Sequence, residues 1–241
     1  MVELWQGLKS QFITSFIVDD RWKLIVEGIG NTLIITFFAL ILGTVLGVII
    51  SAVRSSWDKT SPTMRAGLPK FLFSVINKIC KLYLTVVRGT PMMIQLMIIY
   101  FIILTSTDKI VVAIIAFGIN AGAYIAEIIR AGIMAVDAGQ FEAGRSLGFN
   151  YIQSTWFIVL PQAFKNILPA LANEFIVLLK ETAIAGTIGI TDLTRAAGMI
   201  RGVTFQSFVP LMTVALIYLS LVMFFTWIFG KLERRLRSSE R

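Results

Sequence analysis

The strongest constraint on this chain is a series of apolar windows about 20 residues long that contain few charged side chains. A helix needs about 20 apolar residues to cross the ~30 Å hydrocarbon core of a bilayer. Mean hydropathy is +0.81. Only 15% of the 241 residues are charged, against about 25% in ordinary soluble domains. The sequence therefore predicts an all-α integral membrane bundle forming one domain.

The composition lacks the residues that several classes of function require. The chain has one cysteine, Cys80, and no histidine, so an internal disulfide is excluded. Classical zinc sites and histidine acid–base chemistry are disfavoured. We expect no catalytic residues and no metal site. The net charge of +8 is interpreted as cytoplasmic-face lysine and arginine next to lipid headgroups rather than as a nucleic-acid surface.

Five spans are expected, at residues 25–53, 71–105, 110–135, 162–188 and 206–230. The fourth is the weakest because it carries Pro169, Asn173 and Glu174. Residues 1–23 are expected to form an amphipathic interfacial helix on the extracytoplasmic side rather than a cleaved leader. Residues 231–241 form a basic tail.

Lysine and arginine counts predict the orientation. Segments 54–81, 130–165 and 231–241 carry six, three and five cations, and five spans place all three segments on one side. The opposite side carries seven cations. The positive-inside rule then places the C-terminus in the cytoplasm and the N-terminus outside, in a multi-pass plasma-membrane protein.

Residues 137–161 are too polar for a span and are expected to form a cytoplasmic helix–turn–helix element. Asp137 is expected to cap a first helix at about 140–147, with Gln140 reaching back to it. Gly148 permits the left-handed turn that ends a helix, and a second helix is expected at about 150–158. A Glu142–Arg145 pair is expected at i, i+3. The element carries the apolar residues Phe141, Leu147, Tyr151, Trp156 and Phe157, which favour either a protein partner or a loop lying on the membrane surface.

The spacing within this element resembles the signature of ABC importer permeases: Glu-Ala-Ala, three residues, Gly, nine residues, Ile-x-Leu-Pro. The matching residues are Glu142, Ala143, Gly148, Ile158, Leu160 and Pro161, whereas Gly144 stands where the family usually has alanine. The segments 88–91 with Gln95, 123–130 and 178–182 are similar to permeases for polar amino acids. The resemblance covers roughly residues 24–230.

The resemblance implies a five-span, MetI-like permease domain of the bacterial inner membrane. A second permease copy, identical or related, would complete the pore, and a solute-binding protein would deliver polar amino acids, cationic ones among them. Two cytoplasmic ATPase subunits would dock on the element through Phe141, Glu142, Ala143, Gly144, Arg145, Gly148, Ile158, Leu160 and Pro161. The chain contains no Gly-x-x-x-x-Gly-Lys-Ser/Thr loop, so ATP and Mg would bind the partner ATPase, and this chain is not expected to be an enzyme.

Polar residues within the predicted spans are candidates for a substrate path. Arg88 and Glu127 lie at depths of about 10 and 15 Å, where they could pair with each other or contact substrate. Gly89-Thr90-Pro91 is either a plain proline kink or a helix break whose new N-terminus receives a carboxylate. The full candidate set is Arg88, Thr90, Pro91, Gln95, Asn120, Tyr124, Glu127, Asn173 and Glu174.

Two interpretations stay open beside the importer. An ion-coupled secondary transporter or a channel for small polar solutes would need no ATPase partner.

Segment 186–203, rich in glycine, is either an external gate that contacts the delivery protein or a flexible connector.

Overall fold

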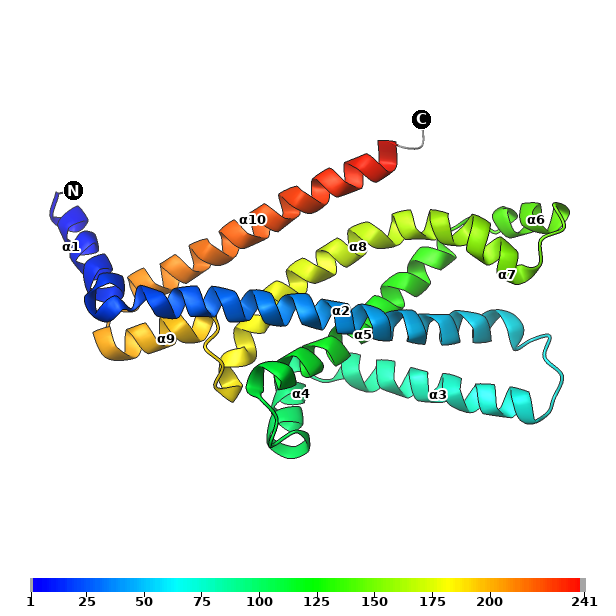
Figure 1. Ribbon diagram of the computed structural model, residues 1–241, viewed down its shortest axis with the longest axis horizontal. Coiled ribbons are helices and arrows are strands. Elements are labelled where there is room, and N and C mark those ends of the chain that lie inside the picture. Colours follow the sequence, from blue (N-terminus) through cyan, green and yellow to red (C-terminus); the bar gives the residue numbers. More distant parts are fainter. Residues whose placement is uncertain (1, 239–241) are drawn as a thin grey trace. The chain divides into compact units, whose positions relative to one another are not determined.

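The computed structural model describes residues 2–238, and within them every regular element is helical (Figure 1). This confirms the all-α class. The elements are α1 (Val2–Phe12), η1 (Ile13–Ile17), η2 (Val18–Asp20), α2 (Trp22–Thr60), α3 (Leu68–Gly89), α4 (Met92–Ile98), η3 (Ile99–Ile103), α5 (Lys109–Met134), α6 (Gly139–Ser146), α7 (Tyr151–Ser154), η4 (Thr155–Val159), α8 (Leu160–Glu181), η5 (Thr182–Ile188), α9 (Leu193–Thr204) and α10 (Phe208–Ser238).

Three helices of the described chain are long and apolar enough to cross a membrane: α2, α5 and residues 208–235 of α10. A fourth span is available if α3 and the α4–η3 segment count as one bent pair. The predicted fourth span, 162–188, corresponds to α8 and η5, which do not meet the same criterion. The segment carries Lys165, Glu174 and Lys180, and the count of five spans stays a prediction.

The chain divides into two compact units. The first contains the residues up to Ala39 together with 92–117 and 176–227. Its core packs α9 against η1, the start of α2 and α10, through Phe16, Ile25, Leu193, Ala196, Ala197, Ile200, Val209 and Val214. Asn31 on α2 donates to the Thr191 carbonyl at 2.9 Å, which ties the turn before α9 to α2.

The second unit contains residues 40–91, 118–175 and those from 228 on. Its α2 and α5 segments pack through two Gly-x-x-x-Gly pairs, Gly43/Gly47 and Gly118/Gly122. A Cβ built at Gly47 would lie 2.6 Å from Ile125, and one built at Gly118 would lie 2.6 Å from Leu42. Glycine lets the two helix backbones approach closely, as in membrane helix pairs generally.

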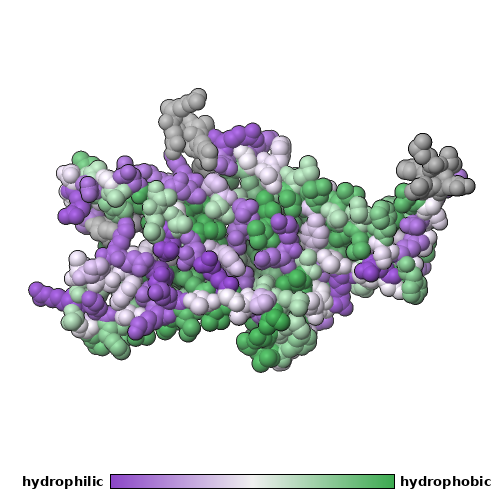
Figure 2. Space-filling view, turned by 180° about the vertical axis from the view of Figure 1, so that it is seen from behind, coloured by the Kyte–Doolittle hydropathy of each residue, from purple (hydrophilic) through white to green (hydrophobic). Residues whose placement is uncertain are grey.

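Large apolar side chains remain exposed on both units. Figure 2 shows the α4–η3 segment as a mostly green, hydrophobic lobe. The exposed residues of that segment include Ile98, Phe101, Ile102 and Ile103. Surfaces of this kind are rare on soluble monomers and are expected where a protein faces lipid or a partner.

Candidate functional site

The end of α6 has the geometry expected from Gly148. Its φ is +83°, in the left-handed region that glycine adopts at little cost. The Gly148 N–H donates to the Arg145 carbonyl at 2.9 Å, and the Phe149 N–H donates to the Gly144 carbonyl at 3.0 Å. These two bonds form a Schellman motif, which stops α6 and reverses the chain.

The capping box that was predicted at Asp137 and Gln140 forms at the next helix instead. The first helix begins after Ala138, and the Asp137 carboxylate accepts from the Gly139 N–H at 2.6 Å instead of capping the helix. Gln140 does not reach back, because its side-chain oxygen accepts from Gln162 at 3.1 Å. The reciprocal box is formed by the next helix, where Asn150 and Gln153 exchange backbone-to-side-chain bonds of 2.9 Å.

Gly144 is required by close packing between α6 and the following helix. An added Cβ would lie 2.6 Å from Ser154 Oγ, 3.1 Å from Ser154 Cβ and 3.0 Å from Ile158 Cδ1. Gly144 and Ser154 are both buried. The departure from the family pattern at Gly144 therefore belongs to the packing of the helix–turn–helix element.

The second helix does not end near residue 158 as expected. Residues 151–181 form one helical run in which α7 continues through the π-helical η4 into α8. In η4 the Leu160 N–H bonds the Thr155 carbonyl, one residue further back than in an α-helix. Pro161 explains this wider turn, because its ring would collide with the carbonyl four residues earlier and it has no N–H to donate.

The element exposes an apolar surface next to an acidic residue. Leu147 and Ile152 are each 74% exposed, and Trp156 and Phe157 are each 65% exposed. Glu142 is also exposed, and the predicted Glu142–Arg145 ion pair is wrong: the ion pairs of the described residues do not include it. Such a pair contributes only a few tenths of a kcal/mol at a solvated site, too little to hold two long side chains.

Phe141 connects the element to the end of α2. The Lys59 ammonium lies 3.5 Å from the centroid of the Phe141 ring, within cation–π range. Phe141 thus points toward the body of its unit, while Leu147, Trp156 and Phe157 remain exposed.

The predicted pairing of Arg88 with Glu127 is also wrong. Glu127 instead pairs with Arg130, one turn along α5, at 3.3 Å. The Arg88 guanidinium lies over the Tyr124 ring, 5.5 Å from its centroid. An i, i+3 partner on the same helix needs no long reach, and it satisfies the Glu127 carboxylate locally.

The other predicted path residues differ in exposure. The chain breaks between α3 and α4, where Thr90 is extended and bonds the Val86 carbonyl at 2.8 Å, so the break at Pro91 is confirmed. The restarted helix α4 has only seven residues. Asn120 is buried, Gln95 and Glu174 are half-buried, and Asn173 is exposed.

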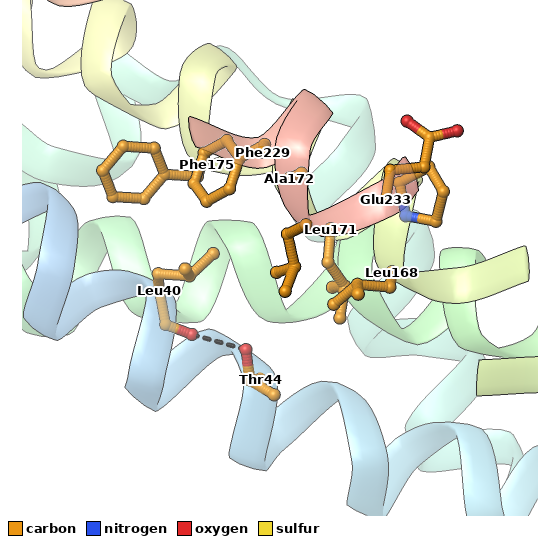
Figure 3. Close-up of a pocket in the computed structure, with 10 residues that line it drawn as sticks. Leu40, Thr44, Leu168, Leu171, Ala172, Phe175, Phe229 and Glu233 are labelled. Atoms are coloured by element: carbon orange, nitrogen blue, oxygen red, sulfur yellow. Dashed lines mark hydrogen bonds between the residues drawn. The ribbon is translucent and has the colours of Figure 1, made fainter. Parts of the chain in front are cut away.

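A pocket of about 190 Å³ lies among α2, α8 and the end of α10 (Figure 3). Its walls are apolar except for Thr44 and Glu233, and Thr44 already donates to the Leu40 carbonyl at 2.7 Å. An amino-acid zwitterion needs several polar partners, so this pocket is a poor substrate site.

Segment 186–203 is folded around Asp192 rather than forming a plain connector. Asp192 is fully buried and caps α9 by accepting from the Thr194 and Arg195 N–H groups. Burial raises the pKa of the Asp192 carboxyl. Arg195 reaches back to the Gly186 carbonyl at 2.7 Å, closing the turn.

The sequence matches the family model described as "Binding-protein-dependent transport system inner membrane component" over residues 64–238. The arginine transport system permease protein ArtQ of Bacillus subtilis (strain 168) is 40% identical over 220 residues, covering 90% of this chain and 94% of that protein. The putative glutamine transport system permease protein GlnP of Rickettsia conorii (strain ATCC VR-613 / Malish 7) is 37% identical over 216 residues, covering 88% and 92%.

Solved structures agree with the sequence relatives. The crystal structure of an amino acid ABC transporter with histidines superposes with a TM-score of 0.79 at 38% identity, covering 91% of this chain and 98% of that one. An inward-facing MetNI methionine ABC transporter gives a TM-score of 0.74 at 21% identity, covering 89% and 97%, and shows the same fold. The chain therefore belongs to the binding-protein-dependent transport system inner membrane component family, the permease subunits of ABC importers.

Proposed function

We propose that this chain is the permease subunit of an importer for polar amino acids, cationic ones included, and that residues 137–161 transmit force from separate ATPase subunits. The observation that carries the proposal is the helix–turn–helix element itself. Its first helix is stopped by a Schellman turn, packed through Gly144, and flanked by the exposed side chains of Leu147, Trp156 and Phe157. Relatives named for arginine and glutamine transport support the substrate class.

The continuity of α7, η4 and α8 supports a mechanical role. Because residues 151–181 form one helical run, a displacement of the α6–α7 turn moves α8 without an intervening flexible loop. The π turn before Pro161 is the point at which this run departs from α-helical bonding. ATP-driven closure of the partner subunits would then rock α8 and alternate the access of a polar path.

The remaining assignments follow from this role. ATP and Mg bind the partner ATPases, a second permease copy completes the path, and a solute-binding protein docks outside. In the five-span topology that we propose, with residues 1–23 outside and 231–241 in the cytoplasm, residues 137–161 lie where an ATPase can reach them. The exposed Arg88 guanidinium above Tyr124 is the strongest candidate to receive a substrate carboxylate.

The test is uptake by proteoliposomes that contain this permease with its partner permease, ATPases and binding protein. We expect uptake to require ATP and to persist when ion gradients are collapsed. Glu142→Lys reverses the charge of an exposed side chain outside the helix packing, so it should leave assembly of the permease in the membrane intact and abolish ATP-driven uptake. Uptake driven by an ion gradient without ATP would support the secondary-transporter alternative instead.

A further inference from the structure

A second pocket, of about 340 Å³, lies within the unit that carries the helix–turn–helix element. It is bounded by the last turns of α2 and α5 and by the start of α6. Its polar lining consists of Ser55, Asp58, Lys59 and Arg130. Its apolar lining consists of Ile133, Met134, Val136, Ala138 and Phe141.

Two buried donors at this pocket lack a hydrogen-bond partner. They are the Ser55 hydroxyl and Arg130 Nε. Arg130 Nη1 points to the Met134 sulfur at 3.1 Å, which is a weak acceptor for a charged donor. Buried donors of this kind cost about 1–3 kcal/mol each when they are left unsatisfied. An oxyanion in the pocket would satisfy both donors and offer Arg130 Nη1 a better acceptor than sulfur.

The surrounding charges select the kind of oxyanion. Lys59 and Arg130 are opposed by Asp58 at the exposed rim and by Glu127, which already pairs with Arg130. This near-neutral balance disfavours a dianion such as free phosphate and suits a singly charged phosphodiester. The apolar wall from Ile133 to Val136 provides a surface for the chain attached to such a group.

The position of the pocket indicates where that phosphodiester comes from. At 1.5 Å per residue α2 is about 58 Å long, nearly twice the hydrocarbon core, so its last turn extends beyond the core. Arg130 and Met134 lie in the last turns of α5, which is also long and apolar enough to span the membrane. Both helix ends are therefore long enough to reach the headgroup layer.

We propose that this pocket binds the phosphodiester of an inner-leaflet phospholipid, held by Ser55, Lys59 and Arg130. The assignment to the inner leaflet rests on the proposed function, because that function places α6 in the cytoplasm. The bound headgroup would contact both the end of α2 and Phe141 of α6. Lipid composition would thereby influence the helix–turn–helix element.

The test is native mass spectrometry of the delipidated importer complex titrated with phosphatidylglycerol or phosphatidylethanolamine in mixed micelles. We expect one tightly retained phospholipid per copy of this chain. Arg130→Gln should weaken retention by about tenfold, the scale of one charge-assisted hydrogen bond, and Ser55→Ala should weaken it by a few-fold. Arg65→Gln, which removes an exposed cation that does not line the pocket, should have no effect.

Arg130→Gln also breaks the ion pair with Glu127, so folding is checked by thermal unfolding. Arg130→Lys keeps the charge without Nε and should retain lipid at an intermediate level. Equal retention by wild type, Arg130→Gln and Ser55→Ala would overturn the proposal. Equal competition by glycerophosphate or inorganic phosphate would overturn the phospholipid as the source of the phosphodiester. A lipid that is retained by the permease subunits alone but is absent from the complex would overturn the proposal and assign the pocket to the ATPase interface. Because binding is measured without uptake, these outcomes are separable from a failure of the transport role.

Discussion

Replacing Gly144 with alanine is expected to loosen the helix–turn–helix element, although alanine is the better helix former. The intrinsic gain from alanine is about 1 kcal/mol. The new methyl would lie 2.6 Å from Ser154 Oγ and 3.1 Å from Ser154 Cβ. The hydroxyl can rotate away, but Cβ cannot, and overpacking at such sites costs about 1–3 kcal/mol. The net change is therefore a destabilisation of α6 against α7 by about 0–2 kcal/mol.

Hydrogen exchange of the peptide covering 139–159 measures this change directly. Gly144→Ala should accelerate exchange there by up to about thirtyfold and reduce ATP-driven uptake. Gly144→Ala with Ser154→Gly removes both contacted serine atoms and should restore protection. Gly198→Ala is the matched control, because a Cβ at Gly198 meets nothing within 4 Å and should be neutral or stabilising. If Gly144→Ala slows the exchange of its own peptide, as the helix preference of alanine alone would, the packing argument is refuted.

Three further variants test other parts of the structure. Gly148→Ala introduces no contact but forces alanine to a φ of +83°, so it should destabilise the end of α6 by about 1–2 kcal/mol. Faster hydrogen exchange at the end of α6 would show this loss, and unchanged exchange would contradict the Schellman turn. Gly47→Val would drive side-chain atoms into Ile125 and should lower the thermal midpoint and the yield of folded protein, and a midpoint equal to wild type would exclude the close α2–α5 packing. The folded-state pKa of Asp192 is raised above 3.8, so the folded state binds more protons than the unfolded state between the two values, and stability falls as pH rises through that window. Asp192→Asn keeps a good helix cap and should flatten this pH dependence of thermal unfolding. An unchanged slope of stability against pH would show that other groups cause the dependence.

Local features of the element were predictable from the sequence because they depend on few residues. Gly148 between two polar helical patterns was sufficient to predict the turn. Asn150 and Gln153 carry the same capping spacing as Asp137 and Gln140, and the structure shows that only the Asn150 box forms. When a capping pattern occurs twice, the sequence alone does not say which copy will form. Here Gln162 donates to the Gln140 side chain, which keeps Gln140 from closing the first box.

Contacts between segments were harder to predict. Similar membrane depth suggested an Arg88–Glu127 pair. Depth says nothing about which way two helices face, and Arg130 satisfies Glu127 from the same helix. The π turn at 155–159 depends on a single proline acting inside a continuing helix, where a simple boundary was expected. The Gly43/Gly47 and Gly118/Gly122 pairs mark the α2–α5 contact. They form a small-residue motif in the sequence, from which no helix contact was predicted.

The most direct test of the account is the energy source for uptake by the reconstituted complex. Radiolabelled arginine or glutamine uptake is measured in proteoliposomes with ATP inside or outside and with ionophores that collapse every ion gradient. The account predicts uptake that needs ATP on the side bearing residues 137–161, survives the ionophores and is lost in Glu142→Lys. Uptake that continues without ATP and disappears with the ionophores would contradict it.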